Sequence, residues 1–539
     1  METDCIHYKD SGFFSKIVLD YLDDAPELSP FYKYKAEIAS FKQAIQERSF
    51  SEEKRVILST ALSKQYDRGN IKLKKEGAVA LNIQSIVAEN TFTVTTGHQL
   101  NLFTGPLYFI YKIVSTIKLS QKLSKTYPDQ NFVPVYWMAT EDHDFEEISF
   151  FRFNGKKIQW KTKQEGAVGR MKTAELQGVF EEFKELLTPY AGNAEALKDL
   201  FESAYLKHEN LSDATRYLVH ELFQDHGLLI LDGDDVQLKQ LFIPQLKAEL
   251  KEEISSKLVA EQNEQLGKHY KIQVNPRSIN LFYLEEGSRK RIVKEGDTFF
   301  IHETELKFSE REFLDILENH PERFSPNVLL RPLYQEVILP NLAYIGGGGE
   351  LAYWFQLKST FEYFKTPLPV LFLRNSALWM DGKTKKYFNA LKLNAAQLFL
   401  EEGVLLKSWV MSNAKLDLSL QSEIEKQQIF FEGLSENAAA VDATLKPHVL
   451  ALAEKQKQLL EQLSDKMIRA ERRKQTVAAK RIHHIKEILF PNNSLQERTD
   501  NFSLLYMAYG DKMIDKLMDV LELPSREFVV LSDKTKGDD

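Results

Sequence analysis

Two short apolar runs in this chain each end at a cluster of polar residues, and a helix-like stretch joins them. The first run, residues 92–95, leads into the polar segment 96–99, and the second, residues 133–139, leads into the acidic segment 140–147. Between them, apolar residues recur at helical spacing after Pro106, a residue suited to the first turn of a helix. This order predicts two parallel strands joined by a helix. Because open α/β sheets bind ligands at the carboxyl ends of their strands, we expect both polar clusters at one ligand-binding edge.

The bulk composition excludes several classes of protein. A chain of 539 residues with 43% hydrophobic and 27% charged residues is folded and too long for one small core. Its formal charge of −8 argues against a nucleic-acid-coating role. With Cys5 as the single cysteine, intramolecular disulfides are excluded and a cysteine-ligated zinc site is not expected. The N-terminus lacks a signal peptide and no run reaches the roughly 18 apolar residues of a membrane span, so we predict a cytoplasmic protein with no membrane partner.

Further strand-like runs extend the predicted sheet. Residues 227–235, 343–350 and 368–374 each join an apolar run to an acidic, glycine-rich or basic end, and residues 328–336 continue this pattern. Between residue 235 and Leu266 the periodicity predicts one long amphipathic helix. We therefore expect an α/β core interrupted by insertions.

Two segments have a different texture from the sheet. Residues 268–326 are rich in β-forming residues, and we predict hairpins with strands at 270–274, 280–284 and 298–301. Beyond residue 385 the chain consists of long charged helices with few glycines. There an apolar stripe approximates a heptad repeat, which is typical of a helical hairpin or a two-chain coiled coil. Its members are Val449, Leu452, Leu459, Leu463 and Met467.

The loop after the first strand is a candidate anion site. It contains Thr96, Gly97, His98 and Gln99, and Thr104-Gly105-Pro106 completes it at the predicted start of the helix. Free N–H groups and the positive end of the helix dipole favour an anion there, and glycines let a ligand approach the backbone. The alternative is a tight turn with an incidental histidine.

The acidic cluster is the strongest functional signal. Five acids and one histidine lie within residues 140–147, and like charges this dense destabilise one another unless a cation or a hydrogen-bond network offsets them. Asp142, His143 and Asp144 could bind Mg²⁺, receive a substrate ammonium group or act as a general base. Adjacent positions on an extended segment cannot all point inward.

A glycine run and three charged residues complete the candidate set. Four glycines precede Glu350 and require backbone conformations or close approaches that side chains forbid, with a flexible hinge as the alternative. Arg331 and Arg374 end or interrupt apolar strands, so each could clamp a carboxylate or phosphate or form a structural ion pair. Asp232 could hold a ribose hydroxyl or an ammonium group, or belong to a solvated helix cap.

Several of these motifs, in this order, give the chain a family resemblance. They are Thr-Gly-His-Gln at 96–99, Phe-Thr-Gly-Pro-Leu-Tyr at 103–108, Thr-Glu-Asp-His-Asp-Phe-Glu-Glu at 140–147, Arg-Pro-Leu-Tyr-Gln-Glu at 331–336, Leu-Pro-Asn-Leu-Ala-Tyr-Ile-Gly-Gly at 339–347, Glu-Leu-Ala-Tyr-Trp at 350–354 and Leu-Gln-Glu-Arg at 495–498. The chain thereby resembles the cysteine ligases of bacillithiol biosynthesis over nearly its whole length. The resemblance implies the last step of that pathway, in which cysteine is joined through an amide to the amine of glucosaminyl malate.

The resemblance also implies a fold, a partner and a cofactor. The implied fold is α/β, with a Rossmann-like nucleotidyltransferase-type core, connecting-peptide insertions and a C-terminal α-helical coiled coil that forms a homodimer. ATP, with Mg²⁺ as an option, would activate cysteine as an acyl phosphate or adenylate. The chain lacks the His-Ile-Gly-His and Lys-Met-Ser-Lys-Ser motifs with which class I synthetases activate a carboxylate, so the sequence leaves the activation step open.

Together the pattern and the resemblance give a domain plan. We predict an N-terminal helical part of the core at 1–90, the first Rossmann half at 91–150, a mostly helical insertion at 151–225, a Rossmann strand and helix at 226–267, a β-rich insertion at 268–326, the second Rossmann half at 327–384, a helical coiled-coil domain at 385–515 and a C-terminal tail returning to the core at 516–539.

In the predicted site, either His98 or His143 is the base for the glucosamine amine. No metal ligands are assigned. The predicted catalytic residues are His98, Asp142, His143 and Asp144. The predicted substrate- or nucleotide-binding residues are Thr96, Gly97, Gln99, Thr104, Gly105, Glu141, Asp232, Arg331, Tyr344, Gly346, Gly347, Glu350 and Arg374. Two other functions stay open: a metal-dependent hydrolase or deacetylase using the acidic cluster, and a coiled-coil scaffold that binds nucleotide as a regulator.

Overall fold

The computed structural model describes residues 1–533, which divide into two compact units. The first unit contains residues 3–378 and 496–529, and the second contains residues 379–495. The sequence-based plan placed these boundaries near 385 and 515 instead. The difference at the second boundary arises because helices α24 (Ser503–Tyr509) and α25 (Met513–Val520) pack against helices of the first unit.

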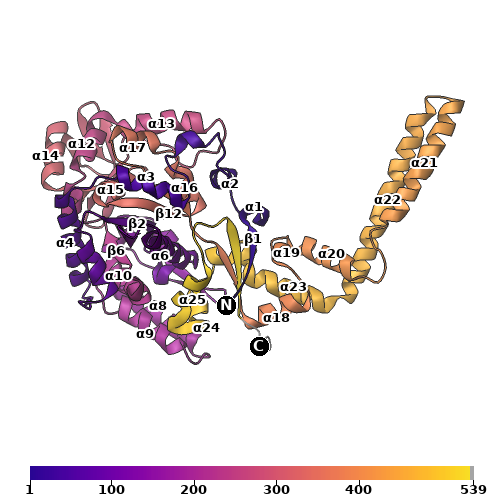
Figure 1. Cartoon of the computed structure of the whole chain (residues 1–539), viewed down its shortest axis with the longest axis horizontal. Helices are drawn as coiled ribbons and strands as arrows, with labels where there is room; N and C mark the ends of the chain where they lie inside the picture. The colour runs from indigo at the N-terminus through magenta and orange to yellow at the C-terminus, as the bar shows by residue number, and fades with distance from the viewer. Residues whose placement is uncertain (534–539) are drawn as a thin grey trace. The chain divides into compact units, whose positions relative to one another are not determined.

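A five-stranded parallel sheet forms the centre of the first unit (Figure 1). Its strand order is β13 (Val370–Leu373), β12 (Asn341–Gly346), β2 (Thr91–His98), β3 (Asn131–Met138) and β6 (Leu229–Asp232). The register sets Gly97 beside Trp137, and Ile345 beside Thr96. The polar segments that follow β2, β3 and β12 therefore share one sheet edge, as the sequence predicts.

The predicted helix between the first two strands is confirmed. Helix α6 (Tyr108–Thr126) follows Pro106 and packs against β2 and β3, with its residues buried almost all round. Helix α4 (Glu52–Arg68), whose N-terminus is capped by the Ser51 side chain, packs against β6 at the far side of the sheet. The N-terminal region also contains α2 (Lys16–Leu22), α3 (Phe41–Glu47) and α5 (Ala78–Ser85).

The first insertion begins with a small hairpin and continues as helices. The hairpin pairs β4 (Phe150–Phe153) with β5 (Lys156–Gln159), and α8 (Gln177–Leu187), α9 (Ala194–Tyr205) and α10 (Leu211–Phe223) follow.

After β6 the predicted single helix is wrong. The structure has α11 (Val236–Gln240), α12 (Ile243–Glu252) and α13 (Ile254–Leu266). Pro244 lies in the first turn of α12, and Glu253 adopts a left-handed backbone conformation with φ of 52° between α12 and α13. The helical periodicity continues through these breaks, which explains why it indicated one element.

The second insertion is an antiparallel sheet with the order β10 (Lys307–Ser309), β9 (Thr298–Ile301), β8 (Ser288–Glu295), β7 (Leu281–Glu285) and β11 (Phe324–Pro326). Helix α14 (Glu310–Asn319) packs against β9 and β10. The strand predicted at 270–274 is absent from the described residues. There the backbone N–H groups of Gln273 and Val274 donate to the Gln356 side chain at 3.2 and 3.1 Å, so no strand partner is needed.

The strand predicted at 328–336 is also wrong, because helix α15 (Arg331–Ile338) occupies this segment. Pro332 lies in its first turn, where a missing N–H costs nothing, and the Asn327 side chain accepts from Leu329 N–H at 2.9 Å. Helices α16 (Gly348–Trp354) and α17 (Lys358–Tyr363) lie between β12 and β13.

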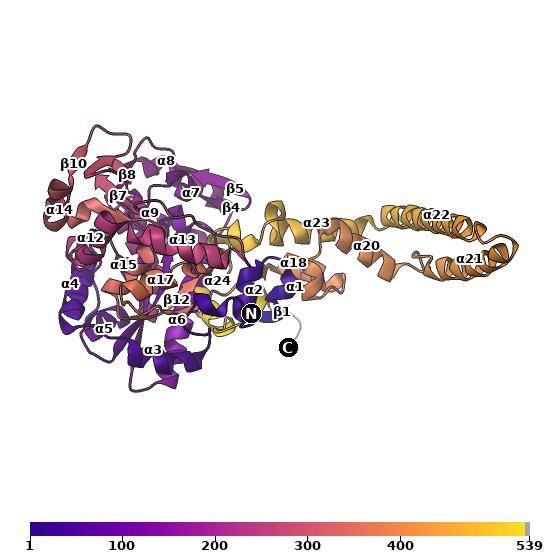
Figure 2. The same ribbon diagram turned by 90° about the horizontal axis from the view of Figure 1, so that it is seen from above.

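The second unit is helical. Helices α18 (Gly382–Ala390), α20 (Glu402–Asn413) and α23 (Thr476–Leu489) accompany a long hairpin of α21 (Gln421–Val441) and α22 (Leu445–Lys474). The two hairpin helices lie side by side in Figures 1 and 2. In the predicted stripe, Leu452, Leu459 and Leu463 remain 44%, 51% and 47% exposed, so α21 does not cover them.

The N- and C-terminal strands pair in a small third sheet. Strands β1 (Glu2–His7), β15 (Glu527–Ser532) and β14 (Ala377–Met380) form a sheet in the order β1-β15-β14.

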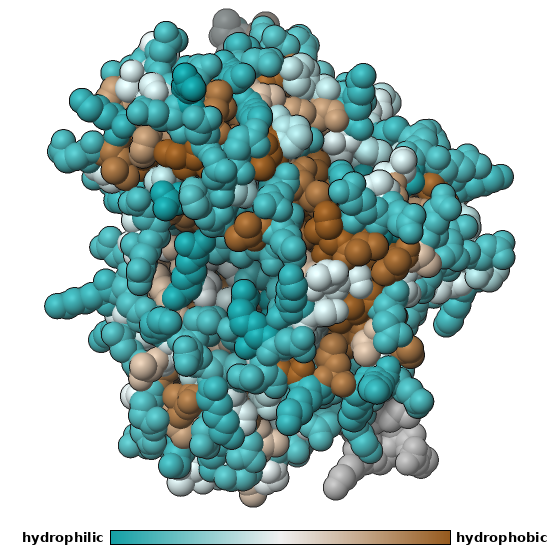
Figure 3. Space-filling view, turned by 90° about the vertical axis from the view of Figure 1, so that its left-hand side faces the viewer, coloured by the Kyte–Doolittle hydropathy of each residue, from teal (hydrophilic) through white to brown (hydrophobic). Residues whose placement is uncertain are grey.

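Within residues 1–533, no helix combines the length and apolar character needed to cross a bilayer. The face drawn in Figure 3 is largely hydrophilic, with hydrophobic residues gathered in a band right of centre and in smaller patches.

Candidate functional site

A cavity of about 340 Å³ opens at the carboxyl ends of β3 and β6. One side consists of residues 137–143, which finish β3 and begin the acidic segment, together with Gly233 after β6. The other side comes from the second insertion and from the start of α15, including Arg289 and Arg331. The cavity therefore lies at the sheet edge where open α/β folds bind ligands.

Asp142 is the ionised acid of this cavity. Gln99 donates from Nε2 to Asp142 at 2.8 Å and to Glu147 at 2.9 Å, and the backbone N–H of His143 donates to Asp142 at 2.7 Å. Burial opposes ionisation, but the hydrogen bonds from Gln99 and from the backbone N–H of His143, with the charge of Arg289, lower the pKa of Asp142 below its usual range. Asp142 is therefore a fixed negative charge that suits a substrate ammonium group.

His143 follows directly and also lines the cavity. Its side chain is 46% exposed, and its Nδ1 lies 2.8 Å from Nη1 of Arg289 and 3.6 Å from Oδ1 of Asp142. Asp144 differs, because it is exposed at the start of the short helix α7 (Phe145–Ile148) and does not line the cavity. The prediction that these three residues cannot all point inward agrees with this geometry.

Positive charge faces the acid across the cavity. Arg289 is buried on β8, stacks on the Phe282 ring at 3.9 Å and donates to Ser325 and Pro326. Arg331, at the start of α15, donates from Nη1 to Gln335 at 3.0 Å, while its buried Nη2 has no hydrogen-bond partner within residues 1–533. The exposed Arg277 is the third guanidinium at the cavity. Three guanidinium groups at one cavity favour an anionic ligand.

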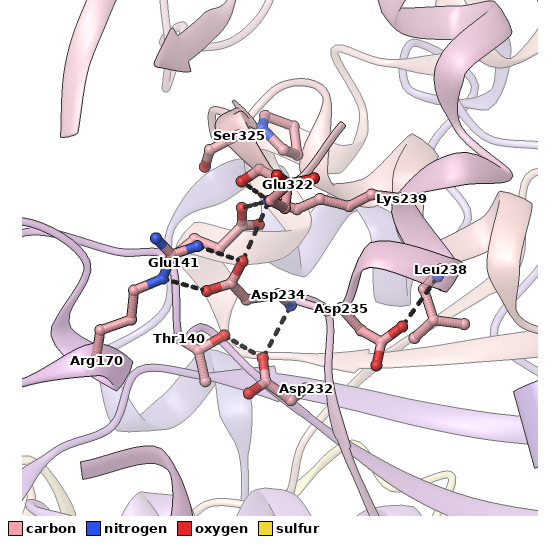
Figure 4. A network of polar contacts seen from close by, with 12 residues as sticks. Thr140, Glu141, Arg170, Asp232, Asp234, Asp235, Leu238, Lys239, Glu322 and Ser325 are labelled. Carbon is pink, nitrogen blue, oxygen red and sulfur yellow. Dashed lines mark hydrogen bonds and ion pairs between the residues drawn. The ribbon is translucent and has the colours of Figure 1, made fainter. Parts of the chain in front are cut away.

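Glu141 lines the cavity, but its carboxylate is engaged in a charged network of the protein itself (Figure 4). Its carboxylate forms an ion pair with the buried Lys239 at 2.5 Å, and Lys239 lies 3.3 Å from Asp234. Arg170 holds Asp234 through two hydrogen bonds at 2.8 and 2.9 Å. Although burial opposes it, Glu141 and Asp234 raise the pKa of Lys239 above its ordinary value.

Asp232, predicted to hold a ribose or an ammonium group, is buried and occupied by the protein. It accepts from the Thr140 hydroxyl, from the Ser212 hydroxyl at 2.8 Å and from the backbone N–H of Asp234 at 2.9 Å. Figure 4 shows how it links the loops after β3 and β6. The structure therefore assigns Asp232 a positioning role beneath the cavity.

A second polar group links the ends of β2 and β12. Lys112 on α6 is buried, donates to the carbonyl of Gly97 and pairs with Glu350 at 2.7 Å. Tyr344 donates to the same carboxylate at 2.6 Å. A Cβ at Gly97 would lie 3.2 Å from the Tyr344 hydroxyl, so the close approach explains the glycine.

The glycine run before Glu350 is not an open anion site. The Glu350 carboxylate itself accepts from the backbone N–H of Gly347 at 2.8 Å and so occupies the start of α16. A Cβ at Gly346 would come within 3.2 Å of the Glu350, Leu351 and Tyr344 side chains. The Glu350 carboxylate therefore occupies the position at which the sequence pattern predicted a bound anion.

His98 and Thr96 lie outside the cavity wall. Thr96 is buried and donates to the carbonyl of Ile345 at 2.8 Å. His98 lies against the rings of Tyr108 and Phe109. Burial, with the nearby charge of Lys112, lowers the pKa of His98 to about 3, so its imidazole is neutral at physiological pH.

The loop after Gln99 and the Arg374 region are also structural. Gly105 has φ of 61°, and a Cβ there would lie 2.5 Å from the Cβ of Asn101. Its neighbour Thr104 is buried in the same packed loop, away from the cavity residues. Arg374 forms two hydrogen bonds with the buried Glu497 at 2.8 and 3.1 Å, which is the structural ion pair that the sequence analysis left as an alternative.

Comparison with known families identifies the family of this chain. A model described as "Bacillithiol biosynthesis BshC, N-terminal Rossmann-like domain" matches residues 1–375, and "Bacillithiol biosynthesis BshC, C-terminal coiled-coil domain" matches residues 377–532. The chain belongs to the BshC family. The resemblance and the fold class predicted from the sequence are thereby confirmed: a Rossmann-like α/β domain followed by a coiled-coil domain.

Relatives match along nearly the full length. Proteins named "Putative cysteine ligase BshC" are similar to this chain. The protein from Flavobacterium psychrophilum is 47% identical, covering 98% of this chain and 99% of its own. The protein from Cytophaga hutchinsonii is 38% identical with 96% of each chain covered, and that from Shouchella clausii is 28% identical with 95% and 96% covered.

Within this BshC family member, sequence reasoning found the cavity residues that follow β3 and Arg331 at the start of α15, and missed those of the second insertion. Asp142, His143 and Arg331 were predicted and line the cavity, while Glu141 lines it and pairs with Lys239. Arg289, missed entirely, comes from the second insertion. The available signal was an arginine within the strand-like run 288–295, whose burial depends on sheet pairing that the sequence does not reveal.

Proposed function

We propose that this chain joins cysteine to the amine of glucosaminyl malate through an amide bond. Family membership and the names of the full-length relatives support a cysteine ligase in bacillithiol biosynthesis. The observation that carries the proposal is the charge pattern of the cavity: ionised Asp142 on one side and the guanidinium groups of Arg277, Arg289 and Arg331 on the other. Both substrates carry an amine and at least one carboxylate, so this pattern complements them.

Asp142, Arg277 and Arg331 then each have a substrate counterpart. Asp142, held ionised by Gln99 and His143, receives an ammonium group. Arg331 and Arg277, which both line the cavity, face the malyl carboxylates. The charges thus orient two small molecules in one enclosed volume, which lowers the entropic barrier to their reaction.

ATP is the proposed co-substrate that converts the cysteine carboxylate into an acyl group with a phosphate-type leaving group. The arginines at the cavity fit such an anion, because guanidinium groups bind phosphate oxygens in pairs. No group of three His, Cys, Asp or Glu side chains within residues 1–533 could hold a metal ion. Any Mg²⁺ would therefore be held largely by the nucleotide phosphates. The alternative hypothesis of a metal-dependent hydrolase or deacetylase has no such group of protein ligands within residues 1–533 to support it.

In the bond-forming step, the neutral amine nitrogen of glucosaminyl malate bonds to the acyl carbon, and the bond from that carbon to the leaving-group oxygen breaks. The leaving group departs with the bonding electron pair, and the nitrogen releases one proton to water. The protein's contribution is orientation and charge stabilisation at the acyl oxygen.

A ligation assay tests the proposal. Purified protein with ATP, Mg²⁺, cysteine and glucosaminyl malate should yield the amide, which mass spectrometry detects. Asp142→Asn should lower turnover at least about tenfold, the typical scale for losing one charged contact of 1.4 kcal/mol or more. Lys247→Gln changes a surface pair with Glu318 and serves as the control. Absence of product from the wild-type chain, or undiminished turnover by Asp142→Asn, would overturn the assignment.

We further propose that two copies pair through the α21–α22 hairpin, in the cytoplasm. Support comes from apolar side chains that the hairpin leaves uncovered, among them Ile429 and Phe430 at 69% and 62% exposed. Burying such a stripe is the usual basis of helix association. The double variant Leu459→Lys, Leu463→Lys should be monomeric in light scattering where the wild type is a dimer. A monomeric wild type would contradict this part of the proposal.

A further inference from the structure

Resting on this proposed function, we propose that Arg289 fixes the tautomer of His143, with the ring proton on Nε2. His143 then enters the reaction as a hydrogen-bond donor at the acyl oxygen and not as the base for the amine. Arg289 is in this sense a positioning residue, because it acts through His143.

The contact between the two side chains determines where the proton sits. Nη1 of Arg289 lies 2.8 Å from Nδ1 of His143. A guanidinium group has donors only and cannot be deprotonated in a protein, so Nδ1 must provide the lone pair of this hydrogen bond. In a neutral imidazole the proton then resides on the other nitrogen. His143 therefore presents Nε2–H, and its only lone pair for accepting a proton is already occupied.

Arg289 is held too firmly to release His143. Its Nε and Nη2 donate to the Ser325 hydroxyl at 3.2 and 3.1 Å, and Nη2 also donates to the carbonyl of Pro326 at 3.2 Å. The guanidinium plane stacks on Phe282 at 3.9 Å, and the residue is 9% exposed. With these contacts in place, only Nη1 is directed at His143.

The other groups facing His143 make Arg289 decisive. Asp142 Oδ1 lies 3.6 Å from the same Nδ1 and would attract a proton there if Arg289 were absent. The Phe282 ring, 5.3 Å away, brings no charge. An Nδ1–H group would place two N–H donors against each other at 2.8 Å, which is unfavourable. Arg289 thus excludes the Nδ1–H tautomer.

This tautomer suits one part of the reaction. The contact with Arg289 uses Nδ1, and the side chain, 46% exposed, lines the cavity. When the amine adds to the acyl carbon, negative charge develops on the acyl oxygen, and a preorganised N–H donor stabilises it. Because Nδ1 is occupied, the proton from the amine leaves to water and not to His143.

Nuclear magnetic resonance of ¹⁵N-histidine-labelled protein reads the tautomer directly, without substrate. The His143 signals are assigned as those lost in His143→Gln, and long-range proton–nitrogen correlations show which ring nitrogen carries hydrogen. At neutral pH we expect the wild-type chain to show Nε2–H alone. In Arg289→Met, Asp142 becomes the partner of Nδ1, so Nδ1–H or imidazolium signals should appear.

Two matched variants control for indirect effects. Lys290→Gln alters the next residue on the same strand, which pairs with Glu303, and Arg277→Gln removes another guanidinium at the cavity. Both should leave the His143 pattern unchanged. A wild-type spectrum with hydrogen on Nδ1, or an Arg289→Met spectrum identical to wild type, would overturn the proposal. The wild-type spectrum alone decides the first point even if Arg289→Met does not fold.

Turnover provides a second readout that a merely structural role would not produce. Glutamine keeps an N–H donor without a basic site, whereas phenylalanine keeps neither. Loss of one oxyanion donor costs about 10²–10³ in turnover, so His143→Phe should fall by this factor and His143→Gln should recover at least about tenfold. Equal loss in both variants would contradict the donor role. A chain with the Nε2–H tautomer but no ligase activity would refute only the proposed function.

Discussion

Replacing Lys239 by methionine tests whether the charged network behind the cavity stabilises the first unit. Lys239 is the cation between Glu141, at 2.5 Å, and Asp234, at 3.3 Å, and its side chain is 2% exposed. Methionine has a similar length and no charge. The substitution therefore removes the compensating charge while largely keeping the packing.

The expected magnitude follows from which carboxylate loses its partner. Asp234 keeps Arg170, which donates to both of its oxygens at 2.8 and 2.9 Å. Glu141 keeps no cation in contact and is left mostly buried. Breaking a buried pair by removing one partner costs about 3–5 kcal/mol. Because only one of the two acids is left uncompensated, we expect the free energy of unfolding to fall by about 3 kcal/mol.

Equilibrium unfolding in urea, followed by tryptophan fluorescence, measures this change. Adding Glu141→Met to Lys239→Met removes the orphaned carboxylate and should recover most of the loss, since apolar replacement of both partners is often neutral. The exposed pair Lys247–Glu318 is the control, and Lys247→Met should cost no more than about 1 kcal/mol.

The pH dependence provides an independent check on the reasoning. Burial raises the pKa of Glu141 above its ordinary value even with Lys239 present, and removing Lys239 takes away the main charge that opposes this rise. In the variant the folded state then binds a proton to higher pH than the unfolded state does, so its stability falls further as pH rises. The defect of Lys239→Met should accordingly be larger at pH 8 than at pH 5. A loss below about 1 kcal/mol, or no recovery in the double variant, would refute the account of the network.

Three further perturbations have expected outcomes. Burial lowers the pKa of His98 to about 3, so at acidic pH the unfolded chain binds a proton that the folded chain does not. The free energy of unfolding should therefore decrease as the pH is lowered below about 6.5. His98→Gln should flatten that slope in urea unfolding, and an unchanged slope would contradict the burial argument. Gly105→Ala should destabilise by at least about 1–3 kcal/mol, because φ is 61° and its Cβ would meet Asn101 at 2.5 Å; a neutral effect would be inconsistent. Arg374→Met should cost about 3–5 kcal/mol by leaving Glu497 buried and unpaired, with Arg374→Met, Glu497→Gln recovering part of it; equal stability of both variants would count against the pair.

The sequence predicted the parallel core because its signals are local. Residues 92–98 and 131–138 are strand-like runs bounded by polar residues, and Pro106 marks the start of the intervening helix. The errors occur where periodicity is ambiguous. Residues 328–336 are apolar enough for a buried strand, yet Pro332 and the Asn327 side chain start a helix there. Short apolar runs do not separate these two outcomes.

The site was predictable only as far as single segments determine it. Asp142 and His143 follow a strand end, so sheet topology alone brings them to the binding edge. Arg289 lies on β8 in a local hairpin with β7, but its place at the cavity depends on contacts with Ser325, Pro326 and His143, which are distant in sequence. The glycines before Glu350 indicated a ligand site, but the backbone N–H of Gly347 donates to the Glu350 carboxylate of the chain itself.

A crystal structure of the protein with glucosaminyl malate bound would test the central claim most directly. We expect the malyl carboxylates to contact Arg331 and Arg277, with the amine directed toward Asp142 and His143 within the cavity at the end of β3. Binding of this molecule at a site that shares none of these residues would contradict the proposal that the cavity is where cysteine is ligated.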